Sequence, residues 1–117
     1  MSRVTIDVER KRSIDQATEI AALDEWFNEQ IERGYTVPGR DFTLSLKSDD
    51  RAYLASTFVL AKEADNFGAP IPSLIDMDGI AHTVTLDYFT LIMLGYNQYY
   101  AALSNNYASQ KQNILDS

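Results

Sequence analysis

The chain has 117 residues, of which 45% are hydrophobic and 23% charged, a size and composition typical of one globular domain. Its formal net charge of -7 disfavours nonspecific binding to nucleic acid or to an anionic membrane. Cysteine is absent, which excludes a disulfide framework, a cysteine-ligated zinc site and a thiol nucleophile. No apolar run approaches the roughly 20 residues of a membrane span, and the N-terminus lacks a signal-peptide core, so we expect folding in the cytoplasm.

Residues 1–12 are predicted as an N-terminal strand or arm that precedes a single α+β domain at residues 13–117. Val4, Ile6 and Val8 alternate with polar residues, which is the period-two pattern of a half-buried strand. The alternatives for this segment are an edge strand, a strand lent to a partner, and an arm that is disordered when alone. A basic run at residues 10–12 then leads into the first helix.

The first helix is predicted from Ser13 or Asp15 to Arg33, with Gly34 as its C-terminal stop. One apolar stripe at helical spacing faces the core, formed by Ile20, Leu23, Phe27 and Ile31. Its other faces are acidic, with Glu19, Asp24, Glu25, Glu29 and Glu32. Such a face is usually solvated, and the functional alternative is that it binds a basic partner.

The next segment predicts a hairpin at residues 35–46, turning at Pro38 and Gly39, where Pro presets φ and Gly accepts a positive φ. Its second strand places one row of side chains inward, namely Phe42, Leu44 and Leu46. Ser48 is the expected cap of the second helix, which runs to about Asn66 and stops at Gly68.

A second hairpin is predicted where residues 73–77 and 80–84 flank Asp78 and Gly79. Thr85 then caps a last helix that continues to about Ile114. The predicted fold class is therefore α+β, with three helices and two short hairpins in the order helix, hairpin, helix, hairpin and long C-terminal helix, packed as two layers. The N-terminal segment can add an edge strand.

No motif in the chain specifies a reaction, a cofactor or a metal. His82 is the only histidine and has no sequence-adjacent nucleophile, so we expect a histidine without a catalytic task. Asp49 and Asp50 suit the first turn of a helix better than a catalytic pair, because adjacent helical residues diverge. The segment around Asp78 fails as a calcium loop, since its first and twelfth positions are not acidic. We therefore predict a protein that is not an enzyme and needs no cofactor.

The last helix carries the most informative surface of the sequence. Between Tyr88 and Leu115 the only charged side chain is Lys111, whereas ordinary solvated helices are rich in Glu, Lys and Arg. Tyrosine is enriched where proteins meet, because it combines an apolar ring with a polar tip. The sequence therefore predicts a protein-covered surface on this helix, formed by Tyr96, Tyr99, Tyr100, Leu103, Asn106, Tyr107 and Gln110.

The linear arrangement of residues 34–114 resembles a small tailed-phage domain, the domain of unknown function 4376, which occurs in tail-fibre and tail-fibre assembly proteins. Residues 37–39 match in the first hairpin, residues 78–79 match in the second, and residues 85–86 open a tyrosine-bearing last helix. The strand before the second turn commonly carries a Trp in the family, whereas Leu74 and Ile75 stand here. The family implies no enzymatic residues.

From the resemblance we expect a noncatalytic structural or docking protein of the bacteriophage tail, associated with the fibre or baseplate and assembled in the host cytoplasm. The expected partners are other phage tail proteins, in a homo-oligomer or a larger symmetric assembly, without nucleic acid or membrane. Two alternatives remain open. One is a tail-fibre assembly chaperone, and the other is a small acidic phage inhibitor of a host or defence protein that uses the acidic face of the first helix.

Overall fold

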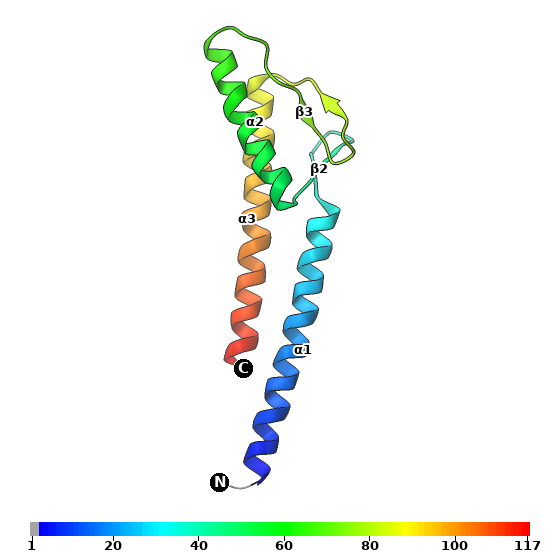
Figure 1. Cartoon of the computed structure of the whole chain (residues 1–117), viewed down its shortest axis with the longest axis vertical. Helices are drawn as coiled ribbons and strands as arrows, with labels where there is room; N and C mark the ends of the chain where they lie inside the picture. Colours follow the sequence, from blue (N-terminus) through cyan, green and yellow to red (C-terminus); the bar gives the residue numbers. More distant parts are fainter. Residues whose placement is uncertain (1–2) are drawn as a thin grey trace.

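The computed structural model describes the backbone of residues 3–117 and the side chains of residues 9–117. Along this part of the chain, the elements follow the predicted order of helix, hairpin, helix, hairpin and long C-terminal helix (Figure 1). The helices are α1 (Arg3–Arg33), α2 (Ser48–Asn66) and α3 (Leu86–Asp116), and the strands are β1 (Tyr35–Thr36), β2 (Thr43–Leu44), β3 (Leu74–Ile75) and β4 (Ala81–His82). The predicted α+β fold class is confirmed.

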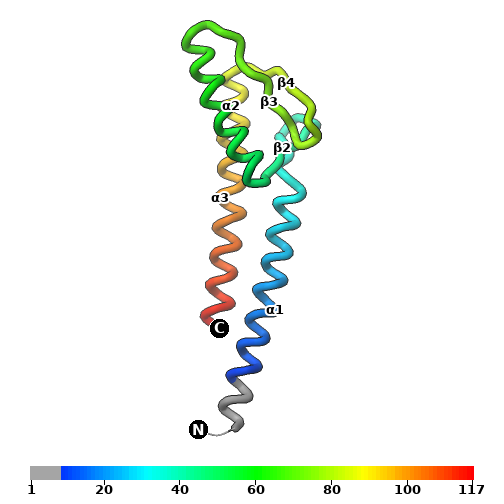
Figure 2. Tube along the Cα trace, in the orientation of Figure 1, coloured from blue at the N-terminus to red at the C-terminus, as the bar shows by residue number. Residues whose placement is uncertain are grey.

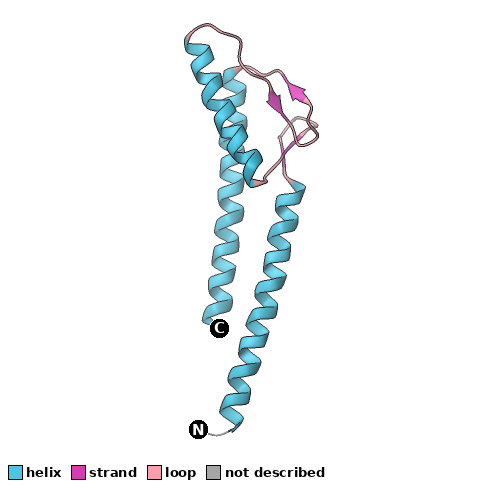
Figure 3. Cartoon of the chain, viewed as in Figure 1, coloured by secondary structure: helices cyan, strands magenta, loops and turns pink. Residues whose placement is uncertain are grey.

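The molecule is elongated, with principal extents of 75 × 24 × 22 Å. Both hairpins and α2 gather at one end around the first half of α3, and we call residues 34–100 the head (Figure 3). The stalk consists of residues 9–33 of α1 and residues 101–116 of α3, which run antiparallel away from the head, with α1 extending beyond the end of α3 (Figures 1 and 2). Because only two helices form the stalk, one face of each helix remains exposed to solvent.

The N-terminal strand predicted ahead of Ser13 is wrong, because α1 already begins at Arg3. A helix satisfies its backbone N–H and C=O groups internally, whereas a strand here would need a neighbouring strand, and none of the described strands adjoins it. Since no glycine or proline interrupts residues 3–33, the helix can continue toward the N-terminus. The predicted end is confirmed at Arg33, where Gly34 follows with a φ of +75°. The side chains of residues 4–8 lie outside the described ones.

The first hairpin forms as predicted, with β1 and β2 antiparallel and Tyr35 opposite Leu44. The N–H of Arg40 donates a hydrogen bond to the carbonyl of Val37 at 3.1 Å and closes the turn. Inside this turn Gly39 has a φ of +76°, as a type II turn requires at that position. The inward row is confirmed by the burial of Phe42, Leu44 and Leu46.

Helix α2 starts at Ser48, but its cap differs from the prediction. The N-cap residue is Lys47, and no side chain makes a capping hydrogen bond, so the predicted role of Ser48 is wrong. The hydroxyl of Ser45 donates instead to the carboxylate of Asp50 in the first turn, at 2.6 Å. The predicted stop is confirmed, since Gly68 follows the helix with a φ of +70°.

The second hairpin also forms, but its loop comprises residues 77–79 and its strands are shorter than predicted. The N–H of Asp76 donates to the carbonyl of Ile80 at 2.9 Å, and the N–H of Gly79 donates back to the carbonyl of Asp76 at 3.0 Å. Gly79 is left-handed, with a φ of +81°. The carboxylate of Asp76 stabilises this wider loop by accepting from the N–H groups of Asp78 and Ile80, at 2.9 and 3.0 Å.

Helix α3 provides the central wall of the core. Its predicted cap is confirmed, because the hydroxyl of Thr85 accepts a hydrogen bond from the N–H of Tyr88 at 3.2 Å. In the head its inward face packs on α2, where the rings of Phe58 and Phe89 stack with centroids 5.3 Å apart. The buried residues of α3 are Phe89, Ile92, Met93, Tyr96 and Leu103.

Candidate functional site

Two of the seven residues predicted for an interface belong to the chain's own core. Tyr96 is 1% exposed, and its hydroxyl donates a hydrogen bond to the backbone carbonyl of Ser45 at 2.6 Å. Burial raises the pKa of Tyr96 to about 12. Leu103 is 8% exposed. Neither side chain is available to a partner in the folded chain, so their placement in an interface is corrected.

Two further tyrosines are half-buried against neighbouring helices of the same chain. The hydroxyl of Tyr107 donates to the carboxylate of Asp24 on α1, and its ring packs on Phe27 with centroids 4.9 Å apart. The hydrogen bond to Asp24 raises the pKa of Tyr107, because a phenolate there would face a carboxylate. The guanidinium of Arg51 on α2 lies 3.8 Å above the ring of Tyr100. Tyr107 therefore connects α3 with α1, and Tyr100 connects α3 with α2.

The remaining three predicted interface residues are exposed along one edge of α3. Tyr99 is 38% exposed, and the centroid of its ring lies 5.3 Å from that of Tyr35. Asn106 and Gln110 are joined by a hydrogen bond from Nε2 of Gln110 to Oδ1 of Asn106, at 2.7 Å. Their separations of seven and four positions place all three on the same side of the helix.

Two leucines on the side of α3 that points away from the core are more exposed than Tyr99. Leu91 is 65% exposed and Leu94 is 55% exposed, although both lie in the most apolar part of the helix. Exposed residues three or four positions apart continue this side without any charged side chain. We call them the outer face of α3: Leu91, Leu94, Gln98, Ala101, Ala102, Asn105, Ser109 and Gln112.

The sequence prediction missed the outer face because it followed the tyrosines. Phe89, Tyr96 and Leu103 form a stripe at spacings of seven, and this stripe is the buried one. Leu91 and Leu94 lie about half a turn away from it, so helical geometry alone places them on the opposite side. Assigning the stripe of Phe89, Tyr96 and Leu103 to the core would have predicted that the opposite side of the helix is exposed.

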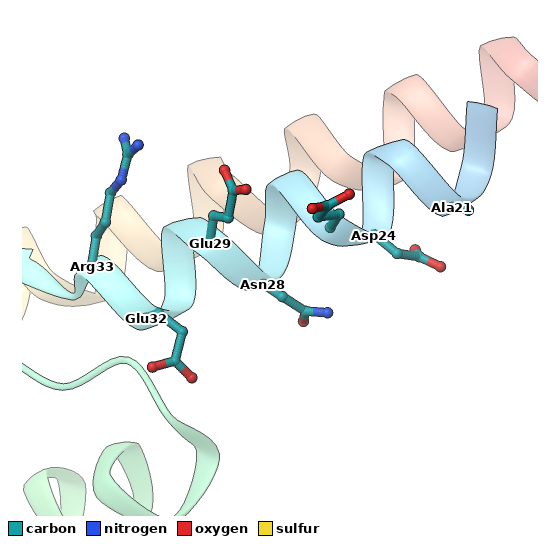
Figure 4. A pocket seen from close by; sticks show the side chains of 7 residues that line it. Ala21, Asp24, Asn28, Glu29, Glu32 and Arg33 are labelled. Carbon is teal, nitrogen blue, oxygen red and sulfur yellow. The ribbon is translucent and has the colours of Figure 1, made fainter. Parts of the chain in front are cut away.

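A second surface of distinct character lies on α1. Its second half carries a shallow depression lined by residues of this helix alone, and Figure 4 shows acidic side chains around it. Two of these are engaged within the chain, because Asp24 accepts from Tyr107 and the carboxylate of Glu32 lies 3.6 Å from Nζ of Lys47. Glu29 and the neighbouring Glu25 remain exposed to solvent.

The polar residues of the head form structural pairs. Nε2 of His82 lies 2.7 Å from the carboxylate of Asp76, and the imidazole stacks on Phe42 with ring centroids 3.9 Å apart. The hydrogen bond from His82 lowers the pKa of Asp76, although burial opposes this effect. The hydroxyl of Ser45 donates to the carboxylate of Asp50, and both residues line a pocket together with Asp76.

Residues 9–117 bring together no group of three or more His, Asp or Glu side chains that could hold a metal ion. Within the described chain, none of the helices is both long and apolar enough to cross a membrane.

No family model, no curated protein and no solved structure matches this chain. The resemblance to the tailed-phage domain therefore stays a prediction.

Proposed function

We propose that this chain is a noncatalytic assembly protein that docks onto another protein through the outer face of α3. The observation that carries the proposal is the exposure of Leu91 and Leu94 at the start of a chargeless helical face. Interface cores are depleted of charged residues, since every buried charge must be desolvated. A partner can cover this face without desolvating a single ionised side chain.

The size of the side chains on this face favours a helical or flat partner. Ala101 and Ala102 follow the two leucines, and small residues let the backbone of a second helix approach closely. The amide and hydroxyl groups farther along, from Asn105 to Gln112, can form hydrogen bonds at the rim of such a contact. From Leu91 to Gln112 the face is about 32 Å long at about 1.5 Å per residue.

The resemblance to the tailed-phage domain supplies the proposed setting. In that setting the chain is a structural or docking component of a bacteriophage tail, and its partner is a fibre, baseplate or tail-tube protein. A tail-fibre assembly chaperone would use the same face but would leave before the particle is complete. The two versions differ in whether the chain stays in the finished particle.

The test is to detect the chain in purified, washed particles and to compare charge substitutions on the outer face with a matched control. Leu94→Glu is expected to abolish incorporation, because burying a carboxylate in an apolar contact is strongly unfavourable. Leu60→Glu is the control, since Leu60 on α2 is 56% exposed and lies outside α3. Incorporation of the Leu94→Glu chain at the normal level would overturn the proposal. Absence of the unaltered chain from particles, with binding to an assembly intermediate, would establish the chaperone version.

A further inference from the structure

A cavity of about 370 Å³ in the head is lined by the start of α2, the second hairpin and Ser45. Helix α2 contributes Asp50, Tyr53 and Leu54, whose spacing of three and four positions places them on one face of the helix. The second hairpin contributes apolar side chains, among them Ile75. Concave sites with apolar walls and a few fixed polar groups are typical of binding sites. The cavity therefore has the composition of a binding site.

Two carboxylates and one hydroxyl supply the polar side chains of this cavity. Asp76 is 9% exposed, and its lowered pKa keeps the carboxylate ionised at neutral pH. Asp50 is exposed, and its Oδ2 accepts the hydroxyl of Ser45 at 2.6 Å. Internal hydrogen bonds therefore hold both carboxylates in position before any ligand binds.

The surroundings of the cavity are acidic when every neighbouring charge is counted. Within two positions of the lining residues there are four carboxylates and two permanent cations, namely Asp49, Asp50, Asp76 and Asp78 with Lys47 and Arg51. Nζ of Lys47 lies 3.6 Å from the carboxylate of Glu32. The guanidinium of Arg51 lies over the ring of Tyr100, 3.8 Å from its centroid. Arg33, the last residue of α1, lines the depression on that helix. Among the described residues, no Lys or Arg forms a salt bridge with these four carboxylates, so the cavity complements a cation.

The oxygens that are already bonded favour an ammonium group over a guanidinium. Oδ1 of Asp76 accepts from two backbone N–H groups, and its Oδ2 lies 2.7 Å from Nε2 of His82. Oδ2 of Asp50 is bonded to Ser45, whereas Oδ1 accepts no hydrogen bond from the described residues. Neither carboxylate therefore offers two free oxygens to the bidentate fork of an arginine. The ammonium group of a lysine is a compact point charge that can bond to a single oxygen.

We propose that this cavity receives the side chain of a lysine from a partner protein. The ammonium group bonds to Oδ1 of Asp50 in the field of Asp76, and the alkyl stem lies along the apolar walls, as lysine stems commonly do. Tyr53 is 53% exposed and Met77 is 36% exposed, so the residues that flank the lysine can cover both side chains. The cavity lies outside the outer face of α3, so this proposal and the docking role of that face can fail independently.

The test is a titration of the isotopically labelled full chain with short peptides at constant ionic strength, followed by NMR of the backbone amides. The peptides carry lysine, norleucine or arginine between alanines, with both ends blocked. The lysine peptide is expected to shift the amides of residues 50–54 and 75–79, with a Kd of about 1 mM for a single anchoring side chain. The norleucine peptide keeps the stem without the charge and is expected to bind at least about tenfold more weakly. The arginine peptide is also expected to bind more weakly than the lysine peptide.

Two substitutions on α2 locate the charge that matters. Asp50→Asn is expected to weaken binding of the lysine peptide at least about tenfold, because a neutral amide replaces the carboxylate that bonds the ammonium group. Asp49→Asn removes the same charge from the adjacent exposed residue, which does not line the cavity, and is expected to change the Kd by less than about threefold. The amide spectrum of each variant alone verifies that it is folded.

Several results would overturn the proposal. Equal binding of the lysine and norleucine peptides would show an apolar pocket without a role for charge. Unchanged binding in Asp50→Asn, or shifts centred on the acidic residues of α1, would show nonspecific attraction to an acidic chain. Tighter binding of the arginine peptide would contradict the choice of lysine. If n-butylammonium binds as tightly as the lysine peptide, the cavity is assigned to a small-molecule amine instead of a partner protein. The absence of shifts at residues 50–54 and 75–79 would exclude the site.

Discussion

The hydroxyl of Tyr96 donates a hydrogen bond to the backbone carbonyl of Ser45 across 2.6 Å of the buried head. This contact joins the middle of α3 to the segment between the first hairpin and α2. Ser45 in turn donates its hydroxyl to Asp50 in the first turn of α2. One tyrosine therefore positions the start of α2 against α3, and the outer face of α3 is left on the opposite side.

Tyr96→Phe is expected to lower the free energy of unfolding by about 1–2 kcal/mol, because it removes a hydrogen bond to a buried carbonyl while keeping the ring. It should also remove the tyrosine that titrates near pH 12 in an absorbance titration. Tyr99→Phe serves as the control, since Tyr99 is 38% exposed and surface changes stay within about 0.5 kcal/mol. Equal stability losses in the two variants, measured by urea unfolding, would contradict the role of Tyr96.

Two left-handed glycines should respond differently to the same substitution. In Gly34→Ala the new methyl would lie 2.7 Å from the carbonyl oxygen of Leu44 and 2.6 Å from Cε of Met77. At Gly68, also left-handed, nothing lies within 4 Å of the methyl position. We expect Gly68→Ala to cost about 1 kcal/mol for the backbone alone, and Gly34→Ala to cost about 2–3 kcal/mol because overpacking adds to it. Thermal unfolding of the pair measures the difference, and similar costs would show that the junction of α1 with β1 is loosely packed.

The ionised carboxylate of Asp76 is expected to make the free energy of unfolding fall at acidic pH. Its folded-state pKa lies below the ordinary value of 3.8, mainly because His82 hydrogen-bonds to the carboxylate. The folded state therefore favours the ionised form, so the contribution is fully present above about pH 4 and is lost as the pH falls through the folded pKa. Asp76→Asn should cost about 1.5–3 kcal/mol near neutral pH and flatten this acid loss. Urea unfolding between about pH 2 and pH 6 measures both effects, with exposed Asp78→Asn as the control. An unchanged acid profile in Asp76→Asn would exclude the carboxylate as its source.

In the stalk, a contribution to stability is expected to be lost at alkaline pH. The hydrogen bond to Asp24 raises the pKa of Tyr107, so the folded state favours the neutral phenol. This contribution to stability is present below about pH 10 and is lost as the pH rises through the folded pKa. Asp24→Asn should shift the pKa of Tyr107 down toward its ordinary value, as followed by NMR of the tyrosine ring. Glu25→Gln, a change at the adjacent exposed carboxylate, should leave that pKa in place. If the pKa of Tyr107 is the same in Asp24→Asn as in the unaltered chain, α1 and α3 do not contact each other at this point.

Local signals in the sequence predict much of the fold. Gly34, Gly68 and Thr85 mark helix boundaries because a left-handed glycine or a capping hydroxyl acts within one turn of its own position. The alternation at residues 4–8 misled the prediction because a strand depends on a distant partner strand, which the sequence pattern does not reveal.

The candidate site was harder to predict for the same reason. Sequence shows that α3 lacks charge, but it does not show which side of the helix the chain itself covers. The hydroxyl of Tyr107 donates a hydrogen bond to Asp24, a carboxylate far away in the sequence on α1, and that of Tyr96 donates to the carbonyl of Ser45. Only the packing of α1 and α2 on α3 decides that the leucines at positions 91 and 94 remain outside.

The most direct test of the docking role is the accessibility of the outer face of α3 in the free protein and in the assembled particle. Leu94→Cys and Leu60→Cys each introduce the only thiol in a chain without cysteine, on two leucines of similar exposure. In the free protein both thiols should react readily with a maleimide. In the particle, the thiol at position 94 should become protected while that at position 60 stays reactive. Equal reactivity of the two thiols in a particle that contains the chain would contradict the claim that the outer face of α3 is covered by a partner.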